Sequence, residues 1–84
     1  MRPEVSEVVR AAWRAVLEVP DAEAAPDFFA AGGTSATAIV LMERVEAELD
    51  IEFPLETLFL RGDLRSVLAD CDERYAGRVR EPGR

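Results

Sequence analysis

With 84 residues, 49% of them hydrophobic, the chain has the length and composition of one small globular domain. Its formal net charge is −7, which argues against nucleic acid as a partner, because binding to a phosphate backbone needs clustered positive charge. The chain has a single cysteine and no run of about 18 apolar residues, so we predict no disulfide, no membrane span and a cytoplasmic location.

Apolar residues at helical spacing predict a first helix from about Pro3 to Leu17. Its buried face consists of Val5, Val9, Ala12, Trp13 and Val16. Pro20, three residues after Leu17, discourages continuation of this helix. The segment from Val19 to Thr34 is predicted to be a long loop, punctuated by two prolines and two glycines. Long loops are usually functional or held in place, and we expect Phe28 and Phe29 to hold this one to the core.

A second helix is predicted from about Ser35 to Leu49, again from apolar residues three and four positions apart. Its core stripe consists of Ala38, Leu41, Met42, Val45 and Leu49. After a short connection, Leu55 to Leu60 is predicted to form one or two turns of a third helix, with Leu58 and Phe59 facing inward.

The last predicted helix starts after Asp63, a good N-cap residue, and runs to about Ala76, where Gly77 ends it. Its inner face consists of Leu64, Val67, Leu68 and Cys71. Residues 78–84 are polar and are expected to form a flexible tail. The predicted fold class is therefore all-α, a small four-helix bundle with a short third helix and a long loop between the first two helices.

The residues Gly32-Gly33-Thr34-Ser35 stand directly before the second helix. A helix N-terminus has backbone N–H groups without intrahelical partners and a partial positive charge, so a phosphate on Ser35 would be stabilised there. The chain has no histidine, so Ser35 has no imidazole base for hydrolytic chemistry. On these four residues alone, an ordinary glycine-preceded helix cap is the more common explanation.

The surrounding residues favour a specific family. Asp27-Phe28-Phe29, Gly32-Gly33-Thr34-Ser35, the helix residues Ala38, Leu41 and Val45, and Phe53-Pro54-Leu55 with Leu58-Phe59 together resemble the thiolation (peptidyl carrier) domains of nonribosomal peptide synthetases. The resemblance covers roughly Val5 to Tyr75 and includes the order of the helices. It implies that Ser35 carries a 4′-phosphopantetheine arm, with Gly32, Gly33 and Thr34 as the supporting loop.

Three positions depart from the family's usual pattern. Ala31 stands where a leucine often precedes the glycines, Thr34 where histidine or aspartate is more usual, and Ala36 where leucine or isoleucine usually follows the serine. None of these changes removes the attachment hydroxyl. They alter the surface around it, which bears on which partners the domain meets.

The resemblance implies a carrier without catalytic residues, which tethers an aminoacyl or related acyl group as a thioester during nonribosomal peptide, antibiotic or hybrid natural-product biosynthesis. Its implied partners are a phosphopantetheinyl transferase, an adenylation enzyme, and condensation, tailoring or thioesterase enzymes. We predict that residues 1–77 form the carrier domain and that the protein is a free-standing monomer.

A docking surface for these partners is predicted on the second helix. If Ala38, Leu41 and their stripe face the core, the side chains of Ala36, Ile39, Val40 and Glu43 lie largely outside it, beside Ser35. The alternative is that Ile39 and Val40 only widen the core stripe.

Other functions are compatible with parts of the sequence. The nearest rival is an acyl carrier of polyketide or fatty-acid synthesis, and a second is an unmodified helical adaptor. A serine hydrolase would lack the common bases, because lysine is absent as well as histidine. We predict no metal site, since Asp21, Glu23 and Asp27 are too scattered for calcium and Cys71 has no histidine with which to bind zinc.

Overall fold

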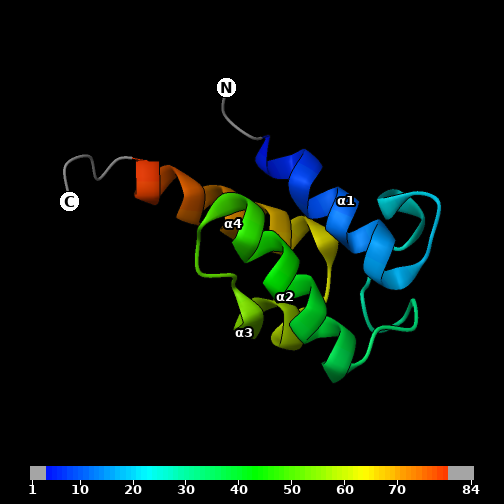
Figure 1. Cartoon of the computed structure of the whole chain (residues 1–84). Helices are drawn as coiled ribbons and strands as arrows, with labels where there is room; N and C mark the ends of the chain where they lie inside the picture. Colours follow the sequence, from blue (N-terminus) through cyan, green and yellow to red (C-terminus); the bar gives the residue numbers. More distant parts are fainter. Residues whose placement is uncertain (1–3, 80–84) are drawn as a thin grey trace.

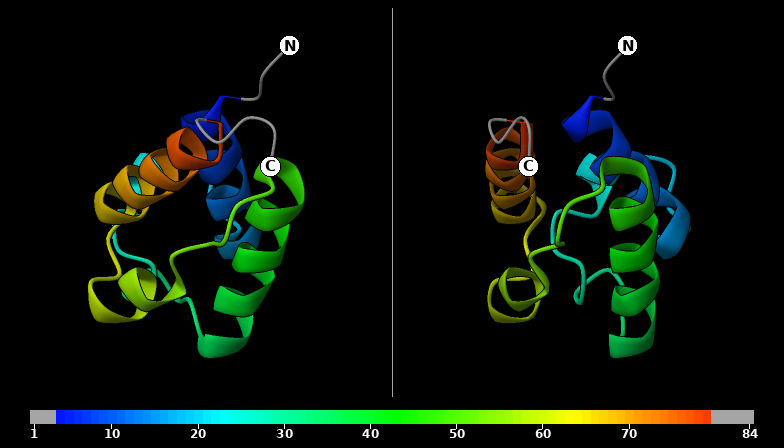
Figure 2. Two further views of the ribbon diagram at one scale, coloured as in Figure 1. Left: turned by 90° about the vertical axis from the view of Figure 1, so that its left-hand side faces the viewer. Right: turned by 60° about the vertical axis from the view of Figure 1, so that its left-hand side comes forward.

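The computed structural model describes residues 4–79, with side chains to residue 77. Its elements are α1 (Val5–Leu17), the 3₁₀ helix η1 (Ala22–Ala24), α2 (Ser35–Leu49), α3 (Leu55–Leu60) and α4 (Leu64–Val79) (Figure 1). The predicted all-α fold with a long loop after the first helix is confirmed. Figure 2 shows α2 on one side of the molecule and α3 with α4 on the other, while α1 packs on both α2 and α4.

The first helix ends where the sequence predicts. Glu18 takes the left-handed conformation (φ 58°) as its C-cap, which turns the chain out of the helix ahead of Pro20. Val5, Val9, Ala12 and Trp13 are buried, and Val16 lies half-buried beside them. The predicted start at Pro3 lies outside the described residues.

The long loop is held to the core by aromatic side chains. Phe28 is fully buried, and its ring meets the rings of Trp13 and Phe29 edge to face, with centroids 5.3 and 5.2 Å away. The Trp13 indole N–H donates to the Ala25 carbonyl at 2.7 Å. The predicted anchoring role of Phe28 is therefore confirmed, and the loop also contains η1, which the sequence analysis missed. The N-cap of η1 is Asp21, whose carboxylate accepts from the Glu23 amide.

The loop is also tied to the junction of α3 and α4. The Phe28 amide donates to the Gly62 carbonyl and the Leu64 amide to the Pro26 carbonyl, each at 2.8 Å, on either side of an isolated antiparallel bridge. Gly62 has φ 77°, which favours glycine. Asp63 caps α4 as predicted: its carboxylate accepts from the Ser66 amide at 2.8 Å, and this hydrogen bond holds the pKa of Asp63 below its ordinary value.

Two details of the prediction are wrong. Phe59 does not face inward: its side chain is 46% exposed and stacks on Phe29, because successive residues of a helix point about 100° apart and Leu58 takes the inward position. Gly77 does not end the last helix, which continues to Val79. A single helical glycine costs only about 1 kcal/mol, so it need not stop a helix. Of the predicted tail, residues 80–84 lie outside the described residues.

The core consists of side chains from every main helix and from the loops. Ala38, Leu41, Val45 and Leu49 of α2 are buried as predicted, while Met42 is half-buried at the edge. Within the described part of the chain, no helix has the length and apolar character that a membrane span requires.

Candidate functional site

The two glycines before α2 serve different geometric needs. A tight turn precedes them, in which the Asp27 carboxylate accepts from the Phe29 and Ala30 amides at 3.1 and 3.0 Å. Gly32 has φ 105°, which side chains rarely allow. Gly33 instead lies against Phe28: a Cβ at Gly33 would stand 2.3 Å from two ring carbons. The turn therefore needs glycine at both positions, once for backbone conformation and once for space.

Thr34, not Ser35, is the residue that caps α2. The Thr34 hydroxyl accepts from the Thr37 amide at 3.2 Å, and the Thr37 hydroxyl accepts from the Thr34 amide at 2.8 Å. This reciprocal pair is a capping box. The signal for this box in the sequence is the pair of threonines three residues apart, and it is not among the predicted features.

Ser35 is therefore not the N-cap residue of α2. It is the first residue of α2 and is exposed, and its hydroxyl forms no hydrogen bond with any described residue. The intrahelical ladder begins with the Ala38 amide, which donates to the Thr34 carbonyl at 2.8 Å, and the capping box takes the Thr37 amide. The amides of Ser35 and Ala36 have no acceptor among the described residues. An exposed hydroxyl beside two free amides at the positive end of a helix fits a phosphate ester.

The predicted docking residues are exposed. Ile39 and Val40 show 38% and 42% of their surface, and Ala36 and Glu43 are exposed as well. The alternative that Ile39 and Val40 widen the core is therefore wrong. That partners dock on these residues stays a prediction.

A second exposed apolar pair, on α3, was not predicted from the sequence. Phe59 is 46% and Leu60 83% exposed, and α3 lies beside the N-terminal half of α2 in both views of Figure 2. The available signal was that four of the six residues in Leu55–Leu60 are apolar, more than one short helix can bury on a single face.

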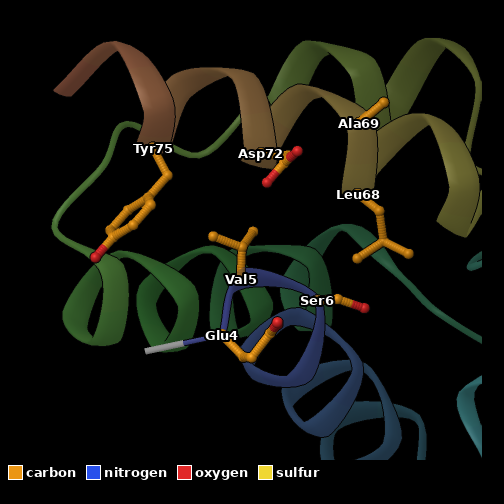
Figure 3. Close-up of a pocket in the computed structure, with 7 residues that line it drawn as sticks. All are labelled: Glu4, Val5, Ser6, Leu68, Ala69, Asp72 and Tyr75. Atoms are coloured by element: carbon orange, nitrogen blue, oxygen red, sulfur yellow. The ribbon is translucent and has the colours of Figure 1, made fainter. Parts of the chain in front are cut away.

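An open groove lies elsewhere, between the start of α1 and α4 (Figure 3). Its lining residues are Glu4, Val5, Ser6, Leu68, Ala69, Asp72 and Tyr75. None of them belongs to the predicted site. Among the described residues, no three His, Cys, Asp or Glu side chains gather as a metal site would require.

Cys71 is predicted to resist alkylation in the native state. Its side chain is fully buried, and burial raises the pKa of the thiol to about 12, so at pH 8 almost none of it is the reactive thiolate. Iodoacetamide at pH 8 should leave the mass of the folded chain unchanged when the chain carries no other thiol. In urea it should add one carbamidomethyl group, and intact-mass spectrometry would show both results. Equal labelling rates with and without urea would contradict the burial of Cys71.

The amino-acid sequence is similar to a known family and to segments of several known proteins. Residues 7–70 match the family model described as the phosphopantetheine attachment site. The chain is 33% identical over 73 residues to surfactin synthase subunit 1 of Bacillus subtilis (87% of this chain, 2% of that protein). It is 34% identical over 67 residues to tyrocidine synthase 3 of Brevibacillus parabrevis (80% and 1%), and 33% over 64 residues to polyketide synthase PksN of Bacillus subtilis (76% and 1%). The chain thus spans 2% or less of the length of these relatives. No solved structure matches it significantly.

Proposed function

The chain belongs to the family of phosphopantetheine attachment domains, and from this premise we propose that Ser35 is the residue that carries its 4′-phosphopantetheine arm. The family match confirms the predicted cofactor and, with the relatives, the predicted role as a peptidyl carrier. The observation that supports Ser35 is its exposed hydroxyl, without a hydrogen-bond partner among the described residues, at the N-terminus of α2.

The residues around Ser35 suit a phosphodiester. The free amides of Ser35 and Ala36 could donate hydrogen bonds to its negatively charged oxygens. The Gly32-Gly33 turn places no side chain over the hydroxyl. When bound, the arm supplies a terminal thiol that holds an acyl group as a thioester.

Attachment requires one substitution at phosphorus. A bond forms between the Ser35 hydroxyl oxygen and the β-phosphorus of coenzyme A, and the bond from that phosphorus to the bridging oxygen breaks. The leaving group is adenosine 3′,5′-bisphosphate, and the hydroxyl proton passes to a base. Since the Ser35 hydroxyl has no hydrogen-bonded side chain among the described residues, we assign that base to the phosphopantetheinyl transferase.

Carrier domains of this family are generally not catalysts, and we propose the same for this chain. Its contribution is tethering, which raises the effective concentration of the acyl group at each partner's active site. The proposed partners are the transferase, an adenylating enzyme, and condensation, tailoring or thioesterase enzymes.

The proposed cargo is an aminoacyl group. Its support is the Gly32-Gly33-Thr34-Ser35 sequence, which resembles the peptidyl branch, while the match to a polyketide synthase favours the acyl alternative. The test offers the phosphopantetheinylated protein an adenylating enzyme with ATP and amino acids, and separately a malonyl transferase with malonyl coenzyme A. A mass gain with malonate alone would overturn the aminoacyl proposal. No phosphopantetheine gain at all would favour the unmodified adaptor.

Variants of the exposed face of α2 should separate docking from folding. We expect Val40→Asp to slow aminoacyl loading by removing apolar contact area, and Glu43→Arg to slow it by reversing a steering charge. The Glu43→Arg defect should shrink at high salt, because salt screens charges over about 10 Å at 0.1 M. Stopped-flow or quenched loading assays measure the rates.

The matched control is Glu48→Arg, the same charge change near the other end of α2, which should load at the wild-type rate. Circular dichroism of all three variants should match the wild type, since the three side chains are exposed. Wild-type loading by both Val40→Asp and Glu43→Arg would mean that partners dock elsewhere.

A further inference from the structure

Thr37 makes more hydrogen bonds with Thr34 than helix capping requires. Besides accepting from the Thr34 amide at 2.8 Å, its hydroxyl oxygen lies 3.0 Å from the Thr34 carbonyl oxygen, to which it donates, and 3.2 Å from the Thr34 hydroxyl. The Thr37 amide returns a bond to Thr34. Four contacts therefore join residues 34 and 37 across the one turn that contains Ser35.

This pairing decides where α2 starts. Serine is itself among the strongest N-cap residues. A helix that began one residue later would place Ser35 at the cap, where its hydroxyl would accept from a backbone amide. The Thr34–Thr37 box engages the amides of Thr34 and Thr37, with the cap one residue earlier, so Ser35 stands inside the first turn with its hydroxyl and its own amide unengaged.

We propose that Thr37 is a positioning residue for phosphopantetheine transfer, which keeps Ser35 out of the cap position and so keeps its hydroxyl available. The proposal rests on Ser35 as the attachment residue. In this role Thr37 acts through Thr34, to which its hydroxyl is hydrogen-bonded, and through the start of α2. Its loss should therefore lower kcat for the transfer while KM, which reflects docking of the transferase, changes little.

The test compares Thr37→Val with Thr37→Ser in the full chain. Thr37→Val keeps the shape and removes the hydroxyl, and kcat should fall roughly 2- to 30-fold, the population change that corresponds to loss of an N-cap. Thr37→Ser restores the hydroxyl and should recover kcat to within about twofold. Thr34→Gly breaks the same box with a residue that N-cap positions tolerate, and it should lower kcat as well, by a smaller factor, which covers the case that Thr37→Val does not fold.

The matched control is Thr57→Val. It removes another threonine hydroxyl, one that donates to Asp70 and joins α3 to α4, so it should lower stability without lowering kcat. A readout besides activity is the ³¹P resonance of the phosphodiester and the amide ¹H–¹⁵N resonances of residues 35 and 36. These should shift in modified Thr37→Val and not in Thr57→Val.

The outcomes are separable. Thr37→Val could keep the wild-type kcat and show unchanged ³¹P and amide resonances, whether or not its melting temperature falls. Thr37 would then be an ordinary helix-capping residue, and the inference would be overturned. Equal defects in Thr37→Val and Thr57→Val would attribute the effect to stability, and would overturn it too. Failure of the proposed function looks different: Ser35→Ala would still gain the arm.

Discussion

Ser35→Ala should abolish the gain of phosphopantetheine completely while the fold stays intact. The variant removes the oxygen proposed to attack coenzyme A and no contact of the fold, because the hydroxyl has no hydrogen-bond partner among the described residues and Thr34 caps α2. Alanine is also the best helix former, so the helix should not suffer. The measurement is intact-mass spectrometry after incubation with coenzyme A and a broad-specificity transferase, with circular dichroism on the same samples.

The other two serines provide the controls. Ser6 and Ser66 are half-buried. The Ser6 hydroxyl accepts from Arg10 at 2.9 Å, and Ser66 is engaged with the Asp63 carboxylate. Ser6→Ala and Ser66→Ala should each gain one arm at the wild-type rate. An arm mapped to either residue, or found on Ser35→Ala, would overturn the assignment.

Leu41→Ala should produce the largest loss of stability among simple truncations in α2. Leu41 is fully buried in the middle of the core, among side chains from the loops and the other main helices, and buried leucine truncations cost about 2–5 kcal/mol. A domain of this size has a total stability of about 4–13 kcal/mol, so the loss is a large share of it. Thermal unfolding by circular dichroism should show a fall in Tm of at least about 8 °C.

Leu60→Ala is the matched control, since it removes the same atoms from a side chain that is 83% exposed. Its unfolding free energy should stay within about 0.5 kcal/mol of the wild type. A Leu41→Ala variant that melts within a degree or two of the wild type would mean that the buried face of α2 is assigned incorrectly.

The sequence by itself determined the position and length of α2. The predicted bounds Ser35–Leu49 agree with the structure, because the signals are local: two glycines, a hydroxyl-bearing cap and an apolar stripe with helical period. The Asp63 cap was predicted for the same reason. An N-cap bonds to an amide two or three residues away, so it depends little on the rest of the chain.

Only the tertiary structure decided which apolar residues are buried at the ends and edges of the helices. Phe59 and Leu60 are as apolar as Leu58, yet they stay 46% and 83% exposed while Leu58 is fully buried. Gly33 looks like a flexible residue in the sequence, but the buried ring of Phe28 is what excludes a side chain there. Burial depends on side chains that are distant in the sequence, and a local sequence pattern does not contain that information.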